Sequence, residues 1–187
     1  CFTFPPPPAW LLCPPQGSVP PSPRPSASPA VSFHNVRSDA DLAALDAALA
    51  GERVVAVAPM VDGGASYTGV LGYVFVAVRA GVFAIDALAT PALLRGLRDV
   101  FADSRTEKVV CGSDGVRALC AAVGTVMTNV FDVEAARDIS AFAADASALF
   151  AKVAGVEYVE ADAWLARPLP THLAARFAQQ AAALLPV

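Results

Sequence analysis

Apolar residues follow two different periods along this chain, which predict strands and helices in alternation after about residue 33. Five short runs rich in Val, Phe and Ile predict β-strands: Arg53–Ala58, Val70–Val78, Val82–Asp86, Lys108–Val110 and Asn129–Asp132. The first three runs follow one another with glycine-containing turns between them. This order favours an antiparallel meander.

Apolar residues at helical spacing predict helices before, between and after these strands. Ser38 is suited to the N-cap of a first helix, and Gly51 is suited to end it. Further helices are predicted over residues 92–101 and 116–123, from residue 133 onward, and last over 171–185. Hairpins followed by strand–helix units predict an α/β fold with one mixed sheet flanked by helices.

The first part of the chain has a different composition. Eleven of the sixteen prolines lie in the first 30 residues. Because proline lacks a backbone N–H and fixes its own φ, residues 1–33 are predicted to be a disordered or polyproline II tail. A ligand for an SH3- or WW-type domain is the functional alternative for this tail. Residues 34–187 are then predicted to form a single domain.

Composition narrows the classes of protein. The net charge is −4, with 13 Lys and Arg against 17 Asp and Glu, which argues against a strongly basic nucleic-acid binder. Charges interrupt every apolar run before about 18 residues, so neither a transmembrane helix nor a membrane partner is predicted. The four cysteines form no closely spaced pair, which favours free thiols and an intracellular location in an undefined compartment.

Several short phrases in the sequence occur in an informative order. They are Val55-Ala56-Val57, Ser66-Tyr67-x-Gly69, Ile85-Asp86, Lys108-Val109-Val110, Val130-Phe131-Asp132 and, near the end, Trp164 followed by Arg167-Pro168-Leu169-Pro170. Together, residues 38–187 resemble the 3'-5' exonuclease domain of the RNase D family, in the DEDD superfamily. The resemblance implies a single domain with a ribonuclease H-like fold.

The chemistry of that family is hydrolysis of a phosphodiester by two divalent cations, which four carboxylates hold. By resemblance, the family's first-strand Asp-x-Glu falls on Ala58 and Met60, and its second-motif Asp falls on Gly115. The Tyr and Asp of the family's last helix fall on Phe177 and Ala181. None of these side chains ligates a hard cation, so the resemblance implies a degenerate site without a metal cofactor.

Two nearby acids are the candidates for a residual site. Asp62 lies two residues after Met60, and Asp114 adjoins Gly115. One or two carboxylates do not hold two Mg2+ or Mn2+ ions against their hydration, so other roles are favoured. These roles are a turn residue for Asp62 and a helix N-cap for Asp114. The alternative is an active metal-dependent 3'-5' exonuclease acting on RNA or single-stranded DNA.

The favoured function is therefore binding without catalysis, in an RNA-processing assembly. One form is a protein scaffold, in which the apolar positions of the former site accept a protein segment. The other is a module that binds RNA or single-stranded DNA. Its candidate contacts are Arg105, Lys108, Arg117, Arg167 and Arg176, although dispersed solvated charges are the favoured interpretation of these residues because the domain is acidic. The alanine-rich face of the last helix is either a protein interface or a core face.

Overall fold

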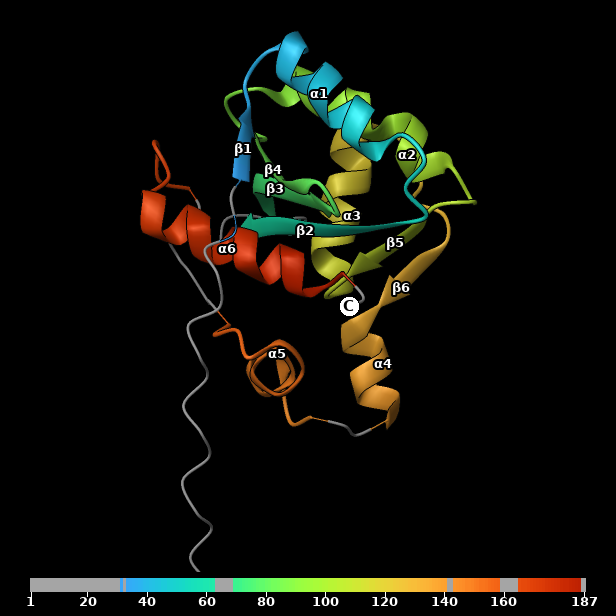
Figure 1. Ribbon diagram of the computed structural model, residues 1–187, viewed down its shortest axis with the longest axis vertical. Helices are drawn as coiled ribbons and strands as arrows, with labels where there is room; N and C mark the ends of the chain where they lie inside the picture. Colours follow the sequence, from blue (N-terminus) through green and yellow to red (C-terminus); the bar gives the residue numbers. More distant parts are fainter. Residues whose placement is uncertain (1–30, 32, 63–68, 141–142, 159–164, 186–187) are drawn as a thin grey trace, which may run out of the picture.

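A six-stranded mixed sheet forms the centre of the computed structural model, which describes residues 31, 33–62, 69–140, 143–158 and 165–185 (Figure 1). Its strands are β1 (Phe33–Val36), β2 (Val54–Asp62), β3 (Val70–Val78), β4 (Gly81–Asp86), β5 (Glu107–Val110) and β6 (Val130–Asp132). They lie in the order β1-β4-β3-β2-β5-β6. β2, β3 and β4 pair antiparallel, and the three remaining pairings are parallel. The predicted mixed sheet, with its meander followed by βα units, is confirmed.

The helices begin and end near the predicted residues. They are α1 (Asp39–Leu49), the 3-10 helix η2 (Pro91–Leu97), α2 (Arg98–Ala102), α3 (Ser113–Val123), α4 (Val133–Ser140), α5 (Ala146–Ala154) and α6 (Thr171–Ala183). Ser38 caps α1 as expected, because its Oγ accepts a hydrogen bond from the backbone N–H of Asp41. No helix in these described parts of the chain combines the length and apolarity that crossing a membrane requires.

Side-chain alternation along the strands divides the core into two layers. Val55 and Val57 of β2 face a cluster built with α1, η2, α2 and α3, whereas Ala56 faces a second cluster built with α5 and α6. In Figure 1, α6 accordingly crosses one face of the sheet, and α1 to α3 cover the other. The result is a three-layer α/β/α domain with the carboxyl end of β2 between α3 and α6.

One expectation about the fold is wrong, and one alternative that the sequence leaves open is decided. The sequence pattern places residue 33 in the tail and predicts no strand there, yet β1 (Phe33–Val36) pairs in parallel with β4. The alanine-rich side of α6 is a core face, because Ala174, Ala178 and Ala181 are at most 6% exposed. The expectations for residues 1–30, for Gly63-Gly64 and Ser66-Tyr67, and for Trp164 lie outside the described residues.

Candidate functional site

The carboxyl end of β2 carries the positions at which the resemblance places two metal-binding carboxylates. Ala58 pairs with Phe75 of β3, and Met60 pairs with Tyr73. Ala58 and Met60 are both half-buried and pack against the cluster under α6. This end of the strand therefore presents a methyl group and a thioether, which do not bind Mg2+ or Mn2+.

Gly115 brings α3 against the same end of β2. A Cβ atom built on Gly115 would lie 2.7 Å from Pro59 Cγ and 3.1 Å from the Pro59 carbonyl oxygen. These distances are shorter than ordinary van der Waals contact, so the close approach of helix and strand requires the absence of a side chain. A carboxylate at this position does not fit unless α3 or β2 moves.

Phe177 and Ala181 lie on the other side of the sheet from Gly115. Both residues are 0% exposed, and the ring of Phe177 packs against Phe75 with 5.9 Å between centroids. The structure thus brings Ala58 and Met60 together with Phe177 and Ala181 in one cluster, and it leaves Gly115 outside that cluster. The expectation that these five positions form an apolar surface is wrong for Phe177 and Ala181, which are core residues.

The two residual acids occupy different environments from those expected. Asp62 is the last residue of β2, paired with Val70, rather than a turn residue. Asp114 is not the N-cap of α3, because the helix begins at Ser113 after Gly112. Its carboxylate instead accepts a hydrogen bond of 2.5 Å from Arg117 at an exposed position on the helix surface.

The donor set does not fit a pair of divalent cations. Within the described ranges, no group of three or more His, Cys, Asp and Glu side chains is arranged to hold a metal ion. The five positions inferred from the resemblance add no ligand, and Asp114 is engaged by Arg117. These side chains therefore do not supply the ligands that a metal ion with a reactive bound water requires.

Four of the five candidate basic contacts lie in ion pairs on separate elements. Arg105 follows α2 and pairs with Asp103, and Arg117 of α3 pairs with Asp114. Arg176 of α6 pairs with Glu157 at 2.8 Å. Arg105 hydrogen bonds to Asp103 and thereby lowers the pKa of that carboxyl to about 2. The fourth pair joins Arg167 to Asp86.

Lys108 is the fifth candidate, and it is buried. Lys108 is 0% exposed, and its Nζ donates hydrogen bonds to the carbonyl oxygens of Asp103 at 2.6 Å and Thr106 at 2.8 Å. Burial lowers the pKa of Lys108, because the charged form loses hydration. In this structure the side chain ties the turn before β5 together, so the expectation of a surface contact with nucleic acid is wrong for Lys108.

Arg167 is the centre of a polar contact that the sequence patterns do not predict. Its Nε lies 2.7 Å from Asp86 Oδ2, its Nη2 donates to the Gly72 carbonyl oxygen, and its guanidinium stacks over the Tyr73 ring at 4.2 Å. Asp86 Oδ1 also accepts hydrogen bonds from the N–H groups of Leu88 and Ala89. Burial raises the pKa of the Tyr73 hydroxyl, and its hydrogen bond with Asp86 raises it further. This network joins β3, β4 and the segment before α6.

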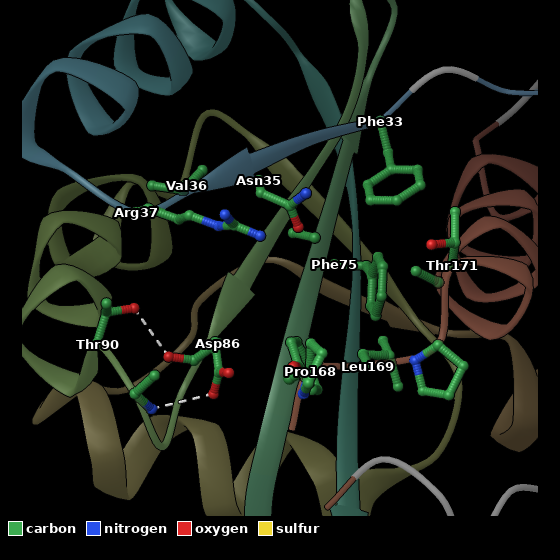
Figure 2. A pocket seen from close by; sticks show the side chains of 15 residues that line it. Phe33, Asn35, Val36, Arg37, Phe75, Asp86, Thr90, Pro168, Leu169 and Thr171 are labelled. Carbon is green, nitrogen blue, oxygen red and sulfur yellow. Dashed lines mark hydrogen bonds between the residues drawn. The ribbon is translucent and has the colours of Figure 1, made fainter. Parts of the chain in front are cut away.

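A pocket of about 580 Å3 lies beside this network, between β1, β4, β3 and the start of α6. Figure 2 shows the side chains of Phe33 and Asn35 from β1, and of Arg37 just after it, around one opening together with Phe75, Leu169 and Thr171. Sequence patterns do not reveal this pocket, because residues 33–36 are not recognised as a strand. The alternation of Phe33, Asn35 and Arg37 is the signal that would have predicted a shared face.

Two further buried groups are missed or only partly predicted by the sequence. Gln180 of α6 is 4% exposed, and its Nε2 has no hydrogen-bond partner in the part of the chain that the structure describes. Cys111, predicted to be a free thiol, is half-buried against the cluster under α6. Burial, with smaller effects of Glu134 and Asp132, raises the pKa of its thiol to about 12.

The fold and the site geometry define an α/β domain of the ribonuclease H-like class. Among solved structures, the catalytic core of RRP6 from Trypanosoma brucei matches with a TM-score of 0.73 and 25% identity, covering 83% of this chain and 44% of that one. RNase D from Trypanosoma brucei matches with a TM-score of 0.68 and 19% identity, covering 81% of this chain and 61% of that one. RNase D from Escherichia coli matches with a TM-score of 0.68 and 20% identity, covering 83% of this chain and 43% of that one.

This chain has the fold of RNase D-like 3'-5' exonuclease domains. It spans less than two thirds of the length of these three structures. No family model matches the sequence, and no curated protein matches it. The expected fold and resemblance are therefore confirmed by the structural comparison.

Proposed function

We propose that this chain is a catalytically inactive 3'-5' exonuclease-like domain that acts by binding, as an RNA-binding module or a protein scaffold, and not by hydrolysis. The observation that carries the proposal is the chemistry at the end of β2. Ala58 and Met60 offer no ligand there, and Gly115 has no room for one beside Pro59. Two-metal hydrolysis needs several carboxylates at this place.

RNA is the partner that the comparisons support better than a protein. A structure of Trypanosoma brucei RNase D in complex with RNA matches this chain over 81% of its length at 18% identity. Loss of carboxylates from the end of β2 also removes negative charge that repels phosphate. The acidic balance of this chain, −4 overall, favours weak binding that is confined to a few contacts.

The test is a cleavage and binding assay on a short labelled single-stranded RNA at low salt, with Mn2+, with Mg2+ and with a chelator. We expect bound RNA of unchanged length under all three conditions, beside an active RNase D as positive control. The double variant Ala58→Asp, Met60→Glu is expected to stay inactive, because Gly115 still has no carboxylate. Cleavage by the unmodified chain that the chelator abolishes would overturn the proposal in favour of an active exonuclease.

Absence of both binding and cleavage would remove the RNA module and leave the scaffold form. That form is tested by co-purification of the full chain with proteins of RNA-processing assemblies. The control is a variant of the half-buried Met60, Met60→Lys, because a lysine at this position would disrupt an apolar contact made there.

A further inference from the structure

The pocket beside β1 presents three side chains from alternate positions of one edge strand and its end. Phe33, Asn35 and Arg37 all line it. His34 lies on the other side, 5.4 Å from the Phe83 ring. Val36 packs into the opposite core at 1% exposed, although it also borders the pocket. Strand alternation therefore places an aromatic ring, an amide and a guanidinium in a row on one face.

The floor of this pocket is apolar and buried. Phe75 is 0% exposed, and Tyr73, Ala84 and Ala174 are each at most 7% exposed. The half-buried Leu169 adds an apolar wall from the segment before α6 (Figure 2). A volume of about 580 Å3 lies within the range of roughly 300–1,000 Å3 that small-molecule sites occupy.

The charged groups of the pocket differ in how many hydrogen bonds and ion pairs they already make within the protein. Asp86 is satisfied by Arg167 and by two backbone N–H groups, so it has little capacity for a ligand. The guanidinium of Arg37 and the amide of Asn35, by contrast, take part in no hydrogen bond or ion pair of 4 Å or less with any described residue. The acid that acts on Arg37 is Asp41, whose pKa is lowered first by the Arg37 backbone N–H and also by the Arg37 charge. Thr171 adds a hydroxyl at the rim. The free polarity of the pocket is thus one cation, one amide and one hydroxyl.

We infer that this pocket binds one nucleotide, with its base against Phe33 and the amide of Asn35 and its phosphate on Arg37. An aromatic ring stacks on any base, and an amide offers a donor and an acceptor to the base edge. A guanidinium binds phosphate through two parallel hydrogen bonds. The nucleotide is either a free nucleoside monophosphate or one unit of an RNA strand, since both share this chemistry.

The inferred site is separate from the positions discussed for catalysis. Ala58, Met60 and Gly115 do not line the pocket. The inference therefore goes beyond the proposed function, and it stands whether or not the chain cleaves RNA.

The test uses the full chain at low salt, titrated with adenosine 5'-monophosphate and followed by 1H–15N NMR. We expect amide shifts at Phe33, Asn35, Arg37 and Thr171. Arg37→Ala should weaken binding about tenfold, and Asn35→Ala several-fold, with the melting temperature unchanged because both residues are exposed. Arg79→Ala is the matched control and should bind the nucleotide as tightly as the unmodified chain, since Arg79 lies in the turn between β3 and β4 and does not line the pocket.

Each other outcome has a defined meaning. Unchanged affinity in Arg37→Ala, or no shifts around the pocket at millimolar nucleotide, overturns the inference. Inorganic phosphate that binds as tightly as the nucleotide overturns it too, because the base is then not recognised. A short RNA that shifts the same amides and competes with the nucleotide identifies the RNA strand as the source. RNA binding without a shift of these amide resonances refutes this site, while the proposed function stands.

Discussion

At the scale of single residues, short polar side chains fix the ends of strands. Asp86 accepts from the N–H groups of Leu88 and Ala89, and Asp132 accepts from those of Gly112 and Glu134. Both aspartates end strands that the sequence predicts, and these hydrogen bonds show that each also caps the segment that follows. Asp132 binds two segments of the chain, so it also links the loop after β5 to the start of α4.

Asp86 is expected to contribute far more to the stability of the fold than an exposed aspartate in a similar ion pair. Asp86→Ala removes two backbone contacts and leaves Arg167 without its counter-ion, where the Arg167 and Asp86 side chains are 27% and 20% exposed. We expect a loss of roughly 2–4 kcal/mol in the free energy of unfolding, measured by urea denaturation.

The control for this substitution is Asp114→Ala, because Asp114 and its partner Arg117 are 85% and 76% exposed. A change within about 0.5 kcal/mol is expected there, because solvent screens exposed ion pairs. Equal effects of the two substitutions would show that the network around Arg167 does not stabilise the domain.

The thiol of Cys111 gives a prediction about pH. Its pKa is raised from 9.0 to about 12 in the folded chain, chiefly by burial. The thiolate is the reactive form, so alkylation of Cys111 at about pH 8–10 should be much slower in the folded than in the urea-unfolded chain. Peptide mass spectrometry after timed iodoacetamide treatment measures this rate for Cys111 alone.

The same shift has a defined sign for stability. Between pH 9.0 and about 12 the unfolded chain has lost the thiol proton and the folded chain keeps it. Unfolding therefore releases a proton, and the contribution of Cys111 to stability falls as the pH rises through this window. Cys111→Ala should reduce that slope, and an unchanged slope would contradict the assignment.

At the scale of elements, the contact between α3 and β2 depends on a missing side chain. A Cβ on Gly115 meets the ring and carbonyl of Pro59, which are rigid, at 2.7 and 3.1 Å. Alanine favours an isolated helix by about 1 kcal/mol over glycine, so destabilisation by Gly115→Ala would report the clash. We expect a loss of about 1–3 kcal/mol, measured as a fall in the denaturation midpoint.

Gly96→Ala is the matched control for this contact. Its Cβ would lie 2.6 Å from Leu42 Cδ2, the far end of a flexible side chain that can change rotamer. A loss below about 1 kcal/mol is expected. If Gly115→Ala is as mild as Gly96→Ala, then α3 can move away from β2 and a carboxylate at residue 115 would also fit.

At the scale of the whole molecule, acidity and paired cations limit how the domain holds RNA. Four of the five candidate contacts are in ion pairs and Lys108 is buried. If RNA binds, the logarithm of its binding constant should fall with the logarithm of the salt concentration at a slope no steeper than about −1.5. This slope corresponds to two phosphate contacts, each of which contributes about −0.7.

Fluorescence anisotropy of a labelled single strand between about 25 and 200 mM KCl measures this slope. Arg37→Ala should make it shallower by about 0.7 if the strand uses the pocket beside β1. A slope of about −3 or steeper would contradict the prediction, because it would require about four phosphate contacts instead of two.

Local sequence patterns were enough to define most elements of this protein. Ser38 before spaced leucines, and the Val-rich runs of β2, β3 and β4, predict the helix and the meander because hydrogen bonding and side-chain periodicity are local. The ordered phrases along residues 38–187 likewise predict the exonuclease-like fold that structural comparison confirms. By resemblance, they also point to the end of β2 as the place where the family's metal-binding carboxylates would lie.

Tertiary packing, in contrast, set the roles of the side chains around that place. β1 has two polar residues among its four, so no apolar run marks it, and it exists through its pairing with β4, where Phe33 lies opposite Val82. Lys108 is a core residue, and Phe177 is absent from the expected surface, because burial depends on what packs above each strand. The pocket joins residues of β1, β3, β4 and α6, which no local period brings together.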